Sequence, residues 1–243
     1  MGTTTTTDRP PTPREHGAWG ILLVPFATAV GVARAWNLPV ALLLVSVLCF
    51  YVARASWLKR QWQWMAVFLA GSVLAAGPLV VIWKLWWLPV FAVVGGILAS
   101  RPTGRTVAEQ LAGMAGLTLT APAAWYALTG QLDATAWWLW GVNAAFFAGG
   151  VFYVRMHLDA ARKLPGCRTG NLIYHVALAV LLLVLGDAGV ISWPVTLAFA
   201  PLVVRAFVGT ARLSPVLRIK RLGWTEVAHS VAFAVLLIWL WER

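Results

Sequence analysis

Long apolar stretches, separated by short polar connections, follow one another along almost the whole chain. A helix that crosses the hydrocarbon core of a bilayer needs about 20 predominantly apolar residues. The second, fourth and seventh stretches are short, and we expect each to extend by a helical turn at one end. The pattern predicts an all-α bundle of about nine transmembrane helices. The nine stretches are Gly17–Ala33, Leu38–Ala53, Trp62–Trp83, Leu85–Ala99, Thr106–Leu128, Ala134–Val154, Leu172–Leu185, Trp193–Gly209 and Trp224–Trp241.

Composition agrees with a membrane protein and leaves no room for a soluble domain. Hydrophobic residues make up 60% of the 243 residues, and charged residues only 11%. Residues 14–243 are therefore predicted to form a single transmembrane domain. Residues 1–13 contain five consecutive Thr and three Pro and show no periodicity, so we predict a disordered cytoplasmic tail.

The formal net charge of +11 has a topological explanation. If the nine stretches alternate, sixteen of the nineteen Lys and Arg residues fall on one face of the membrane and three on the other. Lys and Arg collect on the cytoplasmic side, which predicts a bacterial cytoplasmic membrane protein with its N-terminus inside and its C-terminus outside. The basic charge then requires no nucleic-acid partner. An interfacial aromatic belt is predicted on the outer face from Trp36, Trp83, Trp86, Trp87, Trp137, Trp138, Trp140, Trp193, Trp239 and Trp241.

Ionisable side chains inside a membrane protein cost roughly 2.5–3.5 kcal/mol at the bilayer centre, so their positions are informative. All four His and four of the eight acids lie near predicted cytoplasmic ends of helices. This distribution predicts one polar pocket that faces the cytoplasm. The residues are His16, His157, His175, His229, Glu15, Glu109, Asp159 and Glu226.

The first candidate site is the run Arg14-Glu15-His16 at the start of the first stretch. These side chains are either anchors at the lipid head groups or inward-facing functional groups. In the second case, Glu15 and His16 are expected to relay a proton or hold a metal, with Arg14 contacting a bound substrate.

The ends of the second and sixth stretches are the next candidates, because both carry Phe-Tyr-Val followed by Arg, at Arg54 and Arg155. Arg155 and Asp159 are four residues apart and would meet on one helix face. They form either a structural ion pair or, with Arg162 and Lys163, a site for a phosphate or diphosphate, bound directly or through Mg²⁺.

The start of the last stretch holds Glu226 and His229, which share a helix face. The helix dipole favours an anion in the first turn, which explains part of the presence of Glu226. A single Glu-x-x-His is half of what a carboxylate di-metal bundle needs, so no di-iron site is expected. Arg205, within the eighth stretch, is explained equally well by snorkelling and by ligand binding.

The run PREHGAWGILLVP at 13–25, with GWTEVAH at 223–229, resembles the YwiC-like family of bacterial membrane proteins. Members of that family sometimes occur among respiratory nitrate-reduction genes, so the resemblance implies a respiratory role without defining a reaction. More distantly, the layout is similar to the UbiA superfamily of intramembrane prenyltransferases, whose two Asp-rich diphosphate sites follow the second and sixth helices.

The match to the UbiA pattern is incomplete at those two places. Residues 54–60 contain no acid, and only Asp159 remains at the second place. Mg²⁺ prefers paired carboxylates, so Mg²⁺ is disfavoured as a cofactor, although Arg and Lys side chains could hold an anionic head group directly.

Three functions follow from these observations. The preferred one is a divergent UbiA-like transferase or binder of an anionic lipid, isoprenoid or quinone-type substrate. It would be held by Arg14, Arg54, Arg155, Arg162 and Lys163, with proton or metal chemistry at Glu15, His16, Asp159, Glu226 and His229. The alternatives are a small-anion transporter and a non-catalytic accessory subunit of a nitrate-linked respiratory system. The sequence leaves the oligomeric state open.

Overall fold

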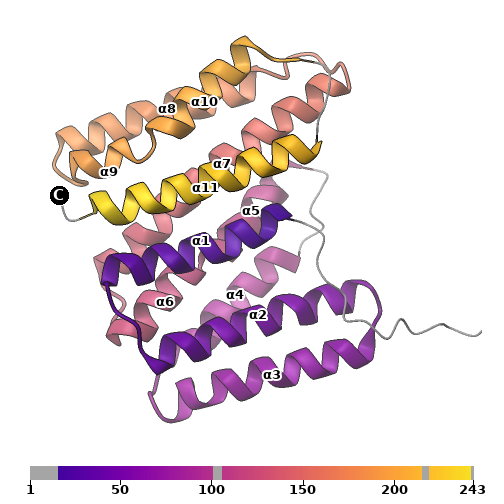
Figure 1. Cartoon of the computed structure of the whole chain (residues 1–243), viewed down its shortest axis with the longest axis vertical. Helices are drawn as coiled ribbons and strands as arrows, with labels where there is room; N and C mark the ends of the chain where they lie inside the picture. Colours follow the sequence, from indigo (N-terminus) through magenta and orange to yellow (C-terminus); the bar gives the residue numbers. More distant parts are fainter. Residues whose placement is uncertain (1–15, 101–105, 215–218, 242–243) are drawn as a thin grey trace, which may run out of the picture.

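The protein's structure, a computed structural model, describes residues 16–100, 106–214 and 219–241. In these ranges the regular structure is entirely helical (Figure 1), which confirms the predicted all-α class. The helices are α1 (His16–Ala33), α2 (Leu38–Leu58), α3 (Trp62–Val81), α4 (Trp87–Ser100), α5 (Val107–Thr118), α6 (Thr120–Thr129), α7 (Ala134–Ala161), α8 (Thr169–Asp187), α9 (Trp193–Leu197), α10 (Ala200–Ala211) and α11 (Ile219–Leu240).

Each of the nine predicted stretches corresponds to one helix or to two consecutive helices. The fifth is divided at Leu119 into α5 and α6, and the eighth into α9 and α10. The second and seventh stretches extend as expected, the second to Leu58 and the seventh at both ends. The fourth stretch corresponds to α4, which begins at Trp87, two residues after the predicted start, and ends at Ser100, where the described residues stop.

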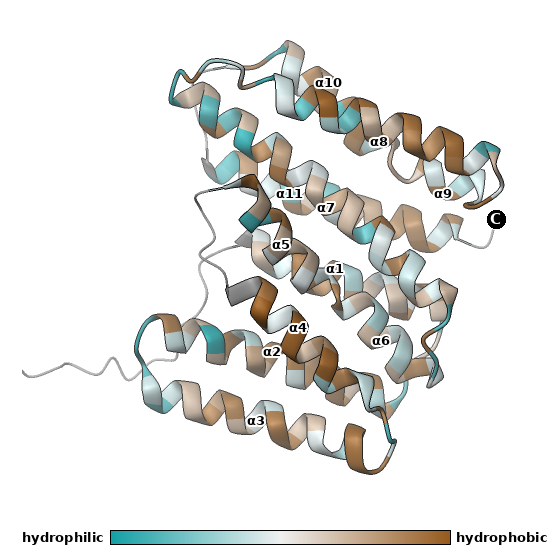
Figure 2. Ribbon diagram, turned by 180° about the vertical axis from the view of Figure 1, so that it is seen from behind, coloured by the Kyte–Doolittle hydropathy of each residue, from teal (hydrophilic) through white to brown (hydrophobic). Residues whose placement is uncertain are grey.

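The outer surface of the bundle is apolar. Large side chains such as Leu74 and Val81 are 76% and 74% exposed, and a lipid environment would cover them favourably. Figure 2 shows hydrophobic residues along the helices and hydrophilic ones mostly near the helix ends. We conclude that this is a multi-pass membrane protein. Six described segments are long and apolar enough to cross a membrane: Leu38–Leu58, Trp62–Val81, Val107–Thr129, Thr169–Asp187, Trp193–Ala211 and Lys220–Leu240.

Two apolar cores lie on either side of α1 and α7. One core joins α7 to α8, α9, α10 and α11, and is centred on Phe146, Phe199 and Phe233. The rings of Phe146 and Phe233 stack with their centroids 4.0 Å apart. The other core joins α1 to α2, α3, α4 and α6, with Val40 and Leu79 fully buried in it. Helices α1 and α7 contribute residues to both cores and therefore lie between them.

Buried polar side chains connect α1 to α6 and α7. Asn143 of α7 donates a hydrogen bond to the Thr28 hydroxyl of α1 at 2.9 Å, and both residues are fully buried. Thr120 of α6 donates to the Leu22 carbonyl of α1 at 2.8 Å. Such bonds hold α6 and α7 against α1 in a fixed arrangement, because in lipid no water replaces them.

Candidate functional site

A cavity of about 530 Å³ opens between α1, α2, α5, α7 and α11. Most of its wall is apolar, but it also carries charged side chains, and we call it the polar cavity. It lies where α1 and α11 begin and where α2 and α7 end, which is the side predicted to face the cytoplasm. Its polar side chains come from four helices and include two guanidinium groups and a carboxylate. They are Tyr51, Arg54, Gln110, Arg155, Glu226 and Ser230.

Arg155 projects from α7 in a helical ion pair. Its Nε lies 3.6 Å from Oδ2 of Asp159, one turn further along the same helix. The side chains remain 34% and 22% exposed. A guanidinium has five N–H donors, so this contact leaves donors of Arg155 for a bound anion.

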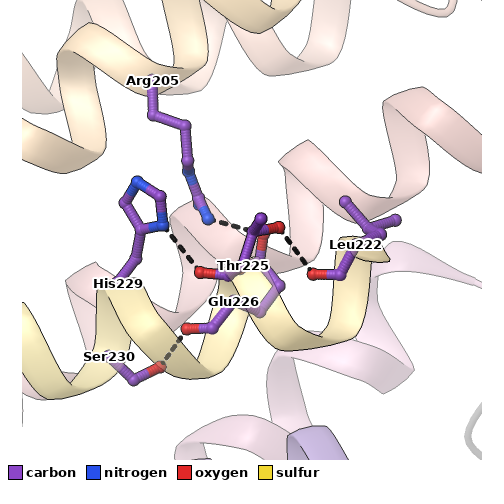
Figure 3. A network of polar contacts seen from close by, with 6 residues as sticks. All are labelled: Arg205, Leu222, Thr225, Glu226, His229 and Ser230. Carbon is purple, nitrogen blue, oxygen red and sulfur yellow. Dashed lines mark hydrogen bonds and ion pairs between the residues drawn. The ribbon is translucent and has the colours of Figure 1, made fainter. Parts of the chain in front are cut away.

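An ion pair with Arg205 of the neighbouring helix α10 holds the Glu226 side chain of α11 in place. Its Oε1 accepts a hydrogen bond of 2.5 Å from Nη1 of Arg205 on α10 (Figure 3), and the Arg205 side chain is only 9% exposed. The guanidinium carbon also lies 4.3 Å from the centre of the Tyr153 ring. The snorkelling explanation of Arg205 is therefore wrong. Its charge points into the bundle, where an ion pair and an aromatic ring compensate it.

α11 begins at Ile219, so Glu226 lies outside its first turn and the expectation that the helix dipole favours Glu226 there is wrong. Around Glu226, side chains of α11 are bound to their own backbone. His229 Nδ1 donates to the Thr225 carbonyl at 2.7 Å, and the Ser230 hydroxyl donates to the Glu226 carbonyl at 2.8 Å (Figure 3). A carbonyl only accepts, so Nδ1 of His229 carries a proton. These bonds orient the residues of α11 beside the Glu226 carboxylate.

The sequence-predicted residues divide into three groups in space. Arg54, Arg155 and Glu226, which are distant in sequence, line the same cavity. Asp159 and His229 lie on the same helices as two of them but are outside the cavity lining. A third group lies elsewhere or outside the described residues. Arg162 and Lys163 are exposed at the end of α7, Arg14 and Glu15 lie outside the described residues, and His16 begins α1 with its side chain outside the description.

Sequence reasoning missed Tyr51, Gln110 and Ser230 in the cavity wall and the partnership of Arg205 with Glu226. For the pair, a signal was present: one buried cation and one buried anion in apolar helices each need a partner. The three uncharged residues gave no comparable signal, because uncharged polar residues are common at the ends of transmembrane helices.

A second, apolar cavity of about 310 Å³ adjoins the first. It lies between the α2–α3 hairpin and α4, α5 and α6, and its wall is mainly aliphatic and aromatic. Tyr51, Arg54 and Leu117 line both cavities. Ser46 and Ser72, two of the polar residues in its wall, bond to each other at 3.1 Å. Arg54 thus lies where the polar cavity and the apolar cavity adjoin.

The carboxylates do not form the set that a Mg²⁺–diphosphate site uses. Among the described residues, no three His, Cys, Asp or Glu side chains are placed to hold a metal ion together. Asp159 contacts Arg155, and Glu109 forms a capping box with Thr106, in which its carboxylate accepts from the Thr106 amide at 3.2 Å. The cavity instead offers cationic donors for direct binding of an anion.

Comparison with known proteins identifies the family of this chain. Residues 12–125 match the family described as YwiC-like protein. The chain is also 30% identical over 236 residues to a Bacillus subtilis (strain 168) protein described as "Uncharacterized protein YwiC", which covers 91% of this chain and 94% of the relative. No solved structure matches the chain. With this identity along nearly the whole length of both proteins, the chain belongs to the YwiC-like family.

Proposed function

We propose that this membrane protein binds an anionic lipid, isoprenoid or quinone-type molecule from the cytoplasmic side. The head group occupies the polar cavity, and the apolar part occupies the adjoining apolar cavity. One observation carries the proposal: Tyr51 and Arg54 line both cavities, so a single amphiphilic molecule can contact both.

The charges of the polar cavity support an anionic head group. Arg54 and Arg155 approach it from different helices, and guanidinium groups bind phosphate and carboxylate with paired, charge-assisted hydrogen bonds. The surplus of Lys and Arg on the same predicted face raises the local concentration of anions. Because two arginines from separate helices converge, the head group is expected to carry the charge at one compact group.

Titration of the purified protein with a fluorescent anionic lipid tests the proposal. Arg155→Gln is expected to weaken binding about tenfold, because a hydrogen bond to a charged group contributes about 1.5–3 kcal/mol. Arg212→Gln, an exposed arginine after α10 and outside both cavities, is the matched control and should bind as the wild type does. Equal binding by wild type and Arg155→Gln would refute the proposed head-group site.

The apolar cavity needs a separate variant. Ala76 of α3 lines it, and Ala76→Phe would fill part of its volume. We expect this change to weaken long-chain anionic lipids while short-chain analogues with the same head group bind unchanged. Loss of both, or of neither, would contradict binding of the apolar part in this cavity.

The two alternative functions make different predictions. A small-anion transporter should take up nitrate or nitrite into liposomes, and an accessory subunit should copurify with a respiratory partner from membranes. Neither outcome requires an apolar chamber next to the basic cavity, and this chamber is the reason for preferring the lipid-like ligand.

A further inference from the structure

We propose that Glu226 selects head groups that carry a hydrogen-bond donor beside their anionic group, such as the hydroxyl of a phosphoglycerol or the ammonium of a phosphoethanolamine. This inference rests on the proposed function and adds a chemical requirement to it. The acceptor is Oε2 of Glu226, and the arginines hold the anion.

The two oxygens of Glu226 have different surroundings. Oε1 accepts from Arg205, but among the described residues no hydrogen bond reaches Oε2. The side chain is 20% exposed, and Glu226 lines the polar cavity. Oε1 is thus bonded within the helical bundle. Oε2 has no such bond, and we infer that it accepts from a head group in the cavity that Glu226 lines.

Gly150 of α7 defines where Oε2 lies. A Cβ built on Gly150 would be 3.3 Å from Oε2, and Gly150 itself lines the cavity. The absence of a side chain at 150 therefore keeps Oε2 uncovered on the cavity side. Any other residue at this position would place its Cβ atom against Oε2.

An ionised carboxylate only accepts hydrogen bonds. A head group with an anion alone would leave Oε2 without a donor and would bring a second negative charge near it, and both effects disfavour binding. A head group that also carries an O–H or N–H donor satisfies Oε2 while its anionic group meets Arg54 and Arg155. The two guanidinium groups and the Glu226 carboxylate thus match a head group that carries both an anion and a hydrogen-bond donor.

Two pairs of lipids test this requirement in titrations of the purified protein. Phosphatidylglycerol and phosphatidylethanol carry the same charge, but only the first has head-group hydroxyls. Phosphatidylethanolamine and phosphatidylcholine differ in the N–H donors of the ammonium. We expect the donor-bearing member of at least one pair to bind about tenfold more tightly. The pair that shows the preference identifies the donor as hydroxyl or ammonium.

Gly150→Ala tests whether Glu226 is the acceptor. The new methyl would press on Oε2 but leave the Arg205–Glu226 pair in place, and alanine is favourable in a helix. The preference should fall to about twofold or less, a free-energy loss near that of one modest hydrogen bond. Gly141→Ala, the same change in the same helix where a Cβ meets nothing within 4 Å, is the control and should keep the preference.

The outcomes separate this inference from the function on which it rests. If anionic lipids bind but neither pair shows a preference, the donor requirement is wrong and the proposed binding function stands. If Gly150→Ala keeps the same preference as Gly141→Ala, Glu226 is not the selecting group. If no anionic lipid binds the wild type at all, the proposed function itself is wrong.

Discussion

Arg205 and Glu226 show how a single pair of residues organises the site. Each charge alone would be costly inside apolar helices, but together they form a short hydrogen bond between α10 and α11. Arg205 also lies against the Tyr153 ring, which sets the depth of the guanidinium. The pair holds Glu226, which lines the polar cavity, through one oxygen, and no described residue forms a hydrogen bond with the other.

Replacing Arg205 alone should lower the free energy of unfolding more than replacing Arg205 and Glu226 together. Arg205→Met leaves a buried carboxylate without its partner, and we expect the free energy of unfolding to fall by about 3–5 kcal/mol. The double variant Arg205→Met/Glu226→Leu should recover most of that loss, because no unpaired charge remains. Thermal or denaturant unfolding in detergent measures both. A double variant as unstable as Arg205→Met alone would show that the pair is not the source of the loss.

At the level of the elements, the cavities depend on helices that approach closely at glycine. A Cβ on Gly116 of α5 would lie 2.8 Å from the backbone oxygen of Gly95 on α4 and 2.8 Å from the Cβ of Leu98. Both glycines line the apolar cavity. Close backbone contact of this kind is typical of transmembrane helices, where small residues allow tight packing.

Gly116→Ala is therefore expected to push α4 and α5 apart. Its methyl group meets backbone that cannot rotate away, so we expect a loss of about 1–3 kcal/mol in the free energy of unfolding. Gly77→Ala in α3, where a Cβ would meet nothing within 4 Å, should leave stability unchanged or raise it by up to about 1 kcal/mol. Unfolding of the two variants side by side checks the difference, and equal stabilities would contradict the close α4–α5 contact.

At the scale of the whole molecule, the ends of α2 and α7 and the starts of α1 and α11 lie at one end of the bundle (Figure 1). Residues near these helix ends line the polar cavity. Sixteen of nineteen cations fall on the face predicted for this end. The positive-inside rule then predicts that the site faces the cytoplasm. A ligand would reach its head-group site from that side and its apolar site from the bilayer.

This orientation can be tested with a native cysteine. Cys167 lies in the connection between α7 and α8, which is predicted to be cytoplasmic, and it is partly exposed. In a Cys49→Ser background, we expect a membrane-impermeant maleimide to label Cys167 in inverted vesicles and not in intact cells. Gln131→Cys, on the opposite side between α6 and α7, with Cys167→Ser, should show the reverse. Labelling of Cys167 in intact cells would overturn the predicted topology.

Much of the architecture was determined by the sequence alone. Apolar length and the placement of Lys and Arg are local, additive properties, so all nine stretches were located from residue type and spacing. The breaks at Leu119 and near Phe199 were not predicted, because the apolar pattern continues through both places. The signal that was present is a proline in the first turn of each following helix, Pro122 in α6 and Pro201 in α10. Arg54, Arg155 and Glu226 were selected for the same local reason, as charges at the ends of apolar helices.

Only the tertiary structure decided which of these charges meet. Arg54, Arg155 and Glu226 lie about a hundred and seventy residues apart at their extremes, and their convergence depends on how α2, α7 and α11 pack around α1. The same packing separates Arg162 and Lys163 from the cavity and pairs Arg205 with Glu226. It also creates the apolar chamber beside the basic one, because a cavity is a property of surfaces that face each other and no single helix encodes it.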